Sequence, residues 1–117
     1  MKKLGVLGDK TYRFAIRIIK AYQFLSKKGE FVLSKQMLRS GTAIGALCRE
    51  AQNAQSKADF LNKMNIALKE ANETEYWLRL LYRTQYLSKE QYESINIDIQ
   101  ELLGLLVSIC RTGSANK

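Results

Sequence analysis

The sequence predicts an all-α protein, an antiparallel up-down-up-down four-helix bundle in which residues 1–117 form a single domain. Apolar residues recur every three or four positions in four segments, at about 10–27, 34–54, 57–85 and 89–112. The connections between these segments are short, the chain contains no proline, and no segment alternates with the period of a β-strand. Hydrophobic residues make up 46% and charged residues 26% of the chain, which is the balance of a folded globular domain.

The first helix is expected to bury large side chains, and the second mostly small ones. The first apolar stripe consists of Tyr12, Ala15, Ile18, Ile19, Tyr22 and Leu25. The second consists of Met37, Gly41, Ile44, Cys48 and Ala51. Gly29 lies between the two helices and separates them, because glycine disfavours the helical state.

The third and fourth helices each follow a capping signal. Ser56 precedes Asp59 by three positions, and Ser88 precedes Gln91 by three, which is the spacing of a capping box. The third helix then carries the apolar stripe Phe60, Met64, Ala67, Ala71, Thr74, Leu78 and Leu81. The fourth carries Tyr92, Ile95, Ile99, Leu102, Leu106 and Ile109.

The fourth helix has apolar residues outside this stripe as well. Its predicted oligomer interface consists of Ile97, Leu103, Leu105 and Val107. A surface helix normally keeps a polar face, so we expect another subunit to cover part of this surface. A wide core stripe within one subunit is the alternative, because periodicity does not identify the neighbour.

The stretch "GTAIGALCRE", residues 41–50, places two glycines inside the second helix. A phosphate-binding loop of the Walker type is excluded, because the spacing is wrong, no lysine ends the stretch and no strand precedes it. Each glycine in a helix interior costs about 1 kcal/mol relative to alanine. We therefore interpret Gly41, Gly45 and Cys48 as a groove for close packing of another helix, within or between subunits. Close approach of a ligand to the backbone is the alternative.

The positive charge belongs to one half of the chain. The net charge is +8, but residues 1–49 hold eleven Lys and Arg against Asp9 and Glu30, a balance of +9. Residues 50–117 are nearly neutral at −1, with eight basic and nine acidic residues. This polarity indicates an anionic partner, nucleic acid before membrane, because no lipid-inserting apolar face accompanies it.

Five basic residues of the first helix fall within about 100° of arc: Lys10, Arg13, Arg17, Lys20 and Lys27. No acidic residue lies between Lys10 and Gly29, so we expect an uninterrupted basic ridge. Its predicted role is to contact the phosphate backbone of RNA or DNA. A solvated basic face is the other interpretation. Phe24 and Phe14 project among or beside these cations, where they could stack on an unpaired base or pack on another subunit.

The sequence argues against enzymatic chemistry. It contains no histidine, the commonest general base and metal ligand, and its two cysteines lack CxxC spacing. Glu70 and Glu73 are three apart, but the Glu-x-x-His pairs of a di-iron bundle are missing. We expect neither cofactor nor metal. The N-terminal apolar run is too short for a signal peptide and no stretch is long enough to span a membrane, so we expect a cytoplasmic protein.

The segment from residue 33 to residue 82 resembles a known family. It contains "LSKQ…LRSG", "REAQNAQSKADF" and "ALKEANETEYWL" in the order and spacing of the proteins encoded within intervening sequences of bacterial 23S ribosomal RNA genes. The flanking helices fit too, so the resemblance covers nearly the whole chain. It implies a four-helix bundle that assembles as a ring-shaped homopentamer. The chain is also similar to the accessory protein of diversity-generating retroelements, a basic, nucleic-acid-binding pentamer.

The resemblance extends to three charged residues, Arg39, Glu50 and Glu73, which match the family pattern. On a bundle they are placed for ion pairing between helices, a structural role. The predicted function is therefore that of a non-enzymatic, oligomeric protein that binds RNA or other nucleic acid. The alternative is a scaffold that docks a protein partner, such as a reverse transcriptase or a ribosome-associated factor.

Overall fold

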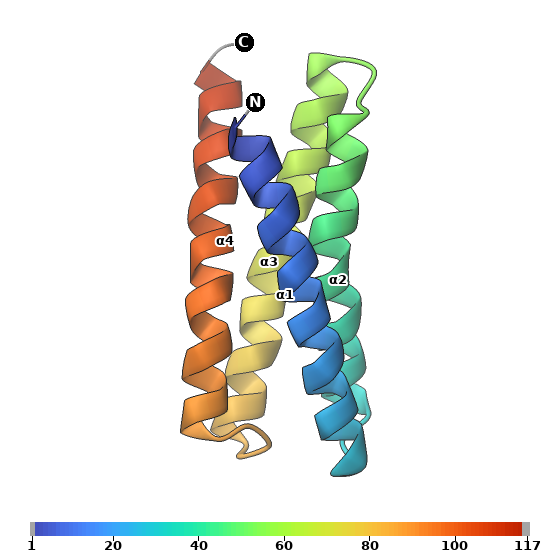
Figure 1. Cartoon of the computed structure of the whole chain (residues 1–117), viewed down its shortest axis with the longest axis vertical. Helices are drawn as coiled ribbons and strands as arrows, with labels where there is room; N and C mark the ends of the chain where they lie inside the picture. Colours follow the sequence, from blue (N-terminus) through green and yellow to red (C-terminus); the bar gives the residue numbers. More distant parts are fainter. Residues whose placement is uncertain (1, 116–117) are drawn as a thin grey trace.

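The computed structural model describes the backbone of residues 2–115 and the side chains of residues 4–114. This part of the chain folds into four helices, α1 (Lys2–Lys27), α2 (Val32–Gln52), α3 (Lys57–Arg83) and α4 (Lys89–Ala115). They form a bundle measuring 46 × 21 × 19 Å. α1 begins and α4 ends at the same end of the bundle (Figure 1). The predicted all-α, antiparallel four-helix bundle is confirmed.

The first helix begins earlier than the sequence pattern indicates. α1 starts at Lys2 rather than near residue 10, because its buried stripe continues through Leu7, which is fully buried. The two early glycines do not interrupt it. α4 likewise extends to Ala115, beyond the predicted end near residue 112.

The predicted core face of α1 is wrong in part, since of its six residues only Ile18 and Leu25 are buried. Tyr12 and Ile19 were expected inside, but they are 64% and 42% exposed. The residues of α1 that are buried are Leu7, Thr11, Phe14, Ile18 and Leu25. The helix has apolar side chains on two flanks, and the period alone does not tell which flank meets the neighbouring helices.

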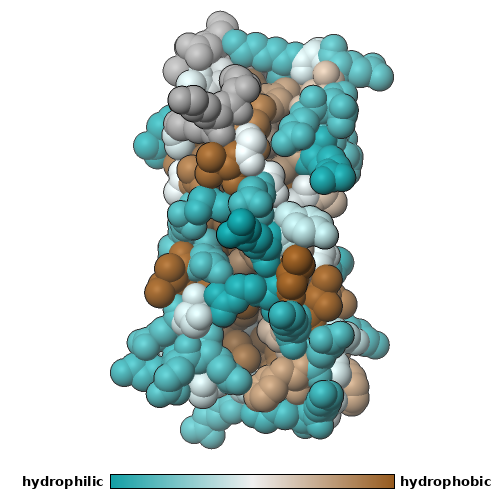
Figure 2. Space-filling view, in the orientation of Figure 1, coloured by the Kyte–Doolittle hydropathy of each residue, from teal (hydrophilic) through white to brown (hydrophobic). Residues whose placement is uncertain are grey.

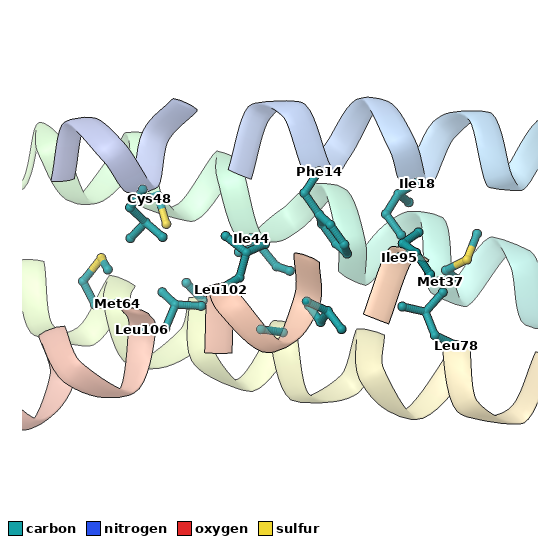
Figure 3. Packing of buried hydrophobic residues seen from close by; sticks show 14 of the residues in the cluster. Phe14, Ile18, Met37, Ile44, Cys48, Met64, Leu78, Ile95, Leu102 and Leu106 are labelled. Carbon is teal, nitrogen blue, oxygen red and sulfur yellow. The ribbon is translucent and has the colours of Figure 1, made fainter. Parts of the chain in front are cut away.

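The stripes of α2, α3 and α4 are confirmed almost residue by residue. Figure 3 shows side chains from all four helices meeting along the bundle axis, among them Phe14, Met37, Met64 and Leu106. Two predicted positions, Phe60 and Tyr92, are only partly buried and pack against the edge of this core.

Three polar side chains fix where the later helices begin. The backbone N–H of Asp59 donates to the Ser56 hydroxyl at 3.0 Å. Ser88 and Gln91 cap each other, with hydrogen bonds of 2.9 and 3.1 Å between the side chain of one and the backbone N–H of the other. Both predicted N-terminal caps are confirmed.

The cap of α2 was not predicted. The buried carboxylate of Glu30 accepts hydrogen bonds from the backbone N–H groups of Val32, Leu33 and Ser34, at 3.1, 3.0 and 2.6 Å. Burial alone favours the neutral acid, but these hydrogen bonds outweigh it, so the pKa of Glu30 lies below its usual value. This cap explains why α2 begins at Val32 rather than at Ser34.

α1 and α2 approach each other closely at Gly41. A Cβ atom on Gly41 would lie 2.8 Å from Cγ1 and 2.9 Å from Cγ2 of Ile18, well inside van der Waals contact. At Gly45 a Cβ atom would meet Thr11 at 3.4 Å, which is ordinary contact, and Cys48 is buried one turn further on. The glycine pair therefore faces α1 of the same subunit, and only Gly41 requires the absence of a side chain. α1 packs far more extensively on α2 than on α4.

We predict that Gly41→Ala destabilises the bundle while Gly104→Ala stabilises it. Alanine adds about 1 kcal/mol of helix propensity at either position. At Gly41 the new methyl group collides with Ile18, a fully buried and β-branched side chain with little rotamer freedom, and overpacking costs about 1–3 kcal/mol. A Cβ atom at Gly104 meets nothing within 4 Å. Urea unfolding of the two variants measures both effects, and equal stabilisation by both substitutions contradicts the close approach.

Candidate nucleic-acid interface

The five predicted basic residues lie along α1 on the side that faces α4 and solvent. Three of them, Lys10, Arg13 and Arg17, lie in the N-terminal and middle parts of the helix, and Lys20 and Lys27 lie towards its C-terminal end. Figure 2 shows this face of the bundle, where hydrophilic side chains surround smaller apolar areas. The five residues differ in what surrounds them.

The ridge is not uninterrupted, because acidic residues pair with its first three cations. Lys10 lies 3.0 Å from Glu101, and Arg13 lies 3.2 Å from Asp9. The Arg17 guanidinium lies 2.7 Å from Asp98. The expectation of an uncompensated row is therefore wrong at Lys10, Arg13 and Arg17. Asp98 and Glu101 belong to α4, and the sequence of α1 alone does not show that they lie beside its cations.

Arg17 is held most firmly of the three. Besides its ion pair with Asp98, its guanidinium donates to the backbone carbonyl of Ser94 at 3.2 Å and to the Ser94 hydroxyl at 2.9 Å. These contacts tie the middle of α1 to α4, where apolar packing between the two helices is sparse. Arg17 thus positions α1 as well as contributing charge.

Lys20 and Lys27 remain available to an outside anion. Both are exposed, and within the described side chains neither has an ion pair. They are seven positions apart, two turns of the helix, so they project from the same side of α1. They lie about 10 Å apart along the helix axis, so different phosphates of one strand could contact the two without displacing a carboxylate.

Among the described residues, two grooves between α1 and α4 differ in charge. The upper groove is lined in part by Asp9, Asp98 and Glu101, the acids that neutralise the first three cations. The lower groove has a volume of about 380 Å³ and no acidic residue in its lining, which consists of Arg17, Lys20, Ala21, Phe24, Leu87, Gln91 and Ile95. In Figure 2 apolar surface is visible recessed between hydrophilic side chains in the lower half of this face.

The two phenylalanines near the cations differ in exposure. Phe14 is 2% exposed and belongs to the core, so the expectation that it could stack on a base is wrong. Phe24 is 38% exposed and forms part of the lower groove. The Lys28 ammonium lies 5.0 Å from the centre of the Phe24 ring and donates to the backbone carbonyl of Tyr86 at 3.1 Å. The ring is therefore held in place at the groove wall.

Arg39, Glu50 and Glu73 lie on α2 and α3, away from the grooves. Arg39 pairs with Glu73 and, at 3.2 Å, with Glu70, which clamps α2 to α3. Glu50 pairs with Lys63 at 3.5 Å. The Trp77 indole N–H donates to Glu73 at 2.9 Å. The hydrogen bond from Trp77, together with Arg39, lowers the pKa of Glu73 although partial burial opposes it.

The four residues of the predicted oligomer interface do not share one face. Leu103 and Leu105 are partly buried against the core of their own subunit, and Val107 is partly buried. Ile97 is 70% exposed and points away from the core. A larger group of exposed apolar side chains lies on α1, where Tyr12, Ile16 and Ile19 are at least 40% exposed.

Neither cysteine is reactive in this environment. Cys48 and Cys110 are buried. Burial raises the pKa of Cys48 to about 11, and it also raises the pKa of Cys110.

Among the described residues, no three potential ligands of the His, Cys, Asp and Glu types gather to hold a metal ion. No described helix is both long and apolar enough to cross a membrane.

Comparison with known proteins identifies relatives of this bundle. The model of a family described as 23S rRNA-intervening sequence protein matches residues 3–108. The chain is also similar to a protein of unknown function from the S23 ribosomal protein family of Bacteroides thetaiotaomicron VPI-5482, whose crystal structure was solved at 1.70 Å resolution. The two share 62% sequence identity with a TM-score of 0.91, over 93% of this chain and 98% of the other. No curated protein sequence matches the chain.

We predict that the fluorescence of Trp77, the single tryptophan, changes with a midpoint below pH 4.5 as Glu73 takes up a proton. The lowered pKa means that the clamp is intact above pH 4.5 and is lost as the pH falls through the folded-state pKa of Glu73. Emission spectra between pH 7 and pH 2 test this, with far-UV circular dichroism to detect unfolding. Glu73→Gln should abolish the step, and a step that survives this substitution contradicts the assignment.

Proposed function

The chain belongs to the 23S rRNA-intervening sequence protein family, and we propose that it is a non-enzymatic protein that binds RNA or another nucleic acid through its phosphate backbone. The proposal rests on the charge and geometry of the α1–α4 face.

One observation carries the proposal: Lys20 lines a groove whose lining contains no acid, and Lys27 is exposed on the same side of α1 two turns further on. Cations that already face a carboxylate gain little from a phosphate, because the new contact replaces an existing one. Unpaired lysines gain a new partner and release condensed counterions from the nucleic acid, which favours binding at low salt. Such contacts fix position without reading sequence.

The five basic residues therefore divide into two roles. Lys20 and Lys27 make the principal phosphate contacts. Arg17 adds positive potential at the rim of the lower groove while its ion pair holds α1 to α4. Lys10 and Arg13 lie beside Glu101 and Asp9, which cancel most of their field, so they extend the footprint weakly.

We also propose that the chain forms a homo-oligomer, as the family resemblance implies, through the outer face of α1. Tyr12, Ile16 and Ile19 recur at helical spacing and are 64%, 40% and 42% exposed. At 100° per residue they lie opposite the buried stripe and beside the basic flank, so a neighbouring subunit on this strip leaves the lower groove open. Five subunits would place five such grooves on one assembly, and multivalent contact raises affinity for a long polyanion.

We predict that Lys20→Gln/Lys27→Gln weakens binding to a structured RNA stem and to a matched DNA duplex alike. Each lost phosphate contact should reduce the slope of log affinity against log salt by about one, so the pair reduces it by about two. Fluorescence anisotropy at several salt concentrations measures the slope. The matched control is Lys69→Gln/Arg79→Gln on α3, which removes the same charge from exposed residues that do not line the groove.

Equal weakening by the two double variants would mean that net charge, and not this face, attracts the nucleic acid. Absence of binding by the wild-type protein at low salt would refute the proposed function and favour a protein partner for the same lysines.

We predict that Ile16→Glu/Ile19→Glu dissociates the oligomer, because two unpaired carboxylates would be buried at each contact between subunits. Ile97→Glu on α4 is the matched control, since Ile97 is more exposed and equally apolar, and it should leave the assembly intact. Light scattering at micromolar concentration measures the mass. A monomeric wild-type protein, or dissociation by the α4 variant alone, contradicts the proposed contact.

A further inference from the structure

We propose that the lower groove holds an unpaired base of single-stranded RNA, stacked on Phe24, while the flanking phosphates contact Lys20 and Lys27. This inference rests on the proposed function and goes beyond it, because it names the form of nucleic acid and a site for a base. Phosphate contacts alone do not distinguish single strands from duplexes, whereas a groove that accepts a base does.

The size of the lower groove fits a flat ring system. Its volume of about 380 Å³ lies at the small end of the range for small-molecule sites, about 300–1,000 Å³. A base enters such a space, and a peptide helix with its side chains is wider. Base pairs within a duplex are closed to it, because their faces are covered by neighbouring pairs.

The chemistry of the lining suits a base as well. Ala21, Leu87 and Ile95 give an apolar surface, and Leu87 and Ile95 are themselves only 5% and 4% exposed, so they are firmly packed. Phe24 adds an aromatic face at the groove wall. Aromatic rings in basic grooves stack on bases of any sequence, which is how many proteins bind single strands.

The position of Phe24 is fixed before any ligand arrives. Lys28 lies over the ring and is itself tied to the carbonyl of Tyr86 across the end of the bundle. A ring that is already held loses less conformational entropy on binding than a free one. The cation covers one face of the ring, so the base we propose stacks on the other face.

Polar groups at the rim complement the edge and the backbone of a nucleotide. The side-chain oxygen of Gln91 accepts a hydrogen bond from the backbone N–H of Ser88. This contact fixes the Gln91 side-chain amide and directs its NH₂ group away from Ser88. This NH₂ group can donate to a ring carbonyl or nitrogen. Lys20 and Arg17 give the rim positive charge, and no carboxylate lines the groove to repel a phosphate.

The test compares a labelled oligouridylate, which has no stable secondary structure, with an RNA duplex of equal length in anisotropy titrations. Phe24→Ala should lower affinity for the single strand by about five- to 150-fold, the range measured when stacking residues are truncated, and should change duplex affinity by less than about twofold. Phe24→Trp should retain single-strand binding, and the introduced indole should be quenched by the RNA. Tyr76→Ala, an exposed aromatic on α3, is the matched control and should alter neither affinity.

The outcomes separate this inference from the function on which it depends. If neither RNA binds even at low salt, the proposed function fails and the base site fails with it. If both RNAs bind equally and Phe24→Ala changes nothing, phosphate binding stands and the base site is refuted. Tighter, Phe24-dependent binding of an acidic helical peptide of Glu and Leu residues also overturns it in favour of a protein ligand. Thermal unfolding of Phe24→Ala establishes that this partly exposed position leaves the bundle folded.

Discussion

The close approach of α1 to α2 at Gly41 is the constraint on which the shape of the α1–α4 face depends. Ile18 occupies the space that a side chain on Gly41 would need, so α1 is drawn onto α2. Figure 1 shows the C-terminal half of α1 diverging from α4, and the two helices make the sparsest packing of the four neighbouring pairs. The lower groove is the space that this divergence leaves. Gly41 on α2 thus helps to shape the lower groove, which lies on the other side of α1.

The polarised charge of the sequence has a structural use in addition to its proposed functional one. Most of the positive charge resides on α1 and α2, and the acids that balance part of it lie on α3 and α4. Asp98 and Glu101 join α4 to α1, while Glu70 and Glu73 join α3 to α2. Exposed ion pairs of this kind contribute little to stability individually, but they fix which helices lie together. The positive charge that these acids do not balance belongs to lysines such as Lys20 and Lys27.

Sequence periodicity was sufficient to predict the fold and the core faces of three of the four helices, α2, α3 and α4. The capping signals at Ser56 and Ser88 and the stripes of α2, α3 and α4 depend on local rules, which a single sequence displays. The core face of α1 was misassigned because both of its flanks are apolar. The cap by Glu30 was missed because a carboxylate two residues before the helix is not a standard N-cap pattern.

The candidate site could be predicted only in part. The cations of α1 were evident from their spacing, but their availability depends on Asp98 and Glu101, some eighty residues or more along the chain. Phe24 was recognised as an aromatic among cations, whereas the groove beside it is formed by residues of α1 and α4 with Leu87 from the preceding connection, and no local pattern contains it. Long-range packing therefore decides which of several similar charges are free to bind.

The most direct test of this account is to map where RNA contacts the protein, by recording amide ¹H–¹⁵N spectra of the labelled protein with increasing oligouridylate. The account predicts that the shifted resonances cluster at residues 17–28 of α1 and 87–95 around the start of α4, the two sides of the lower groove. Shifts concentrated instead near Lys10 and Arg13, or spread evenly over basic residues of all four helices, would contradict it.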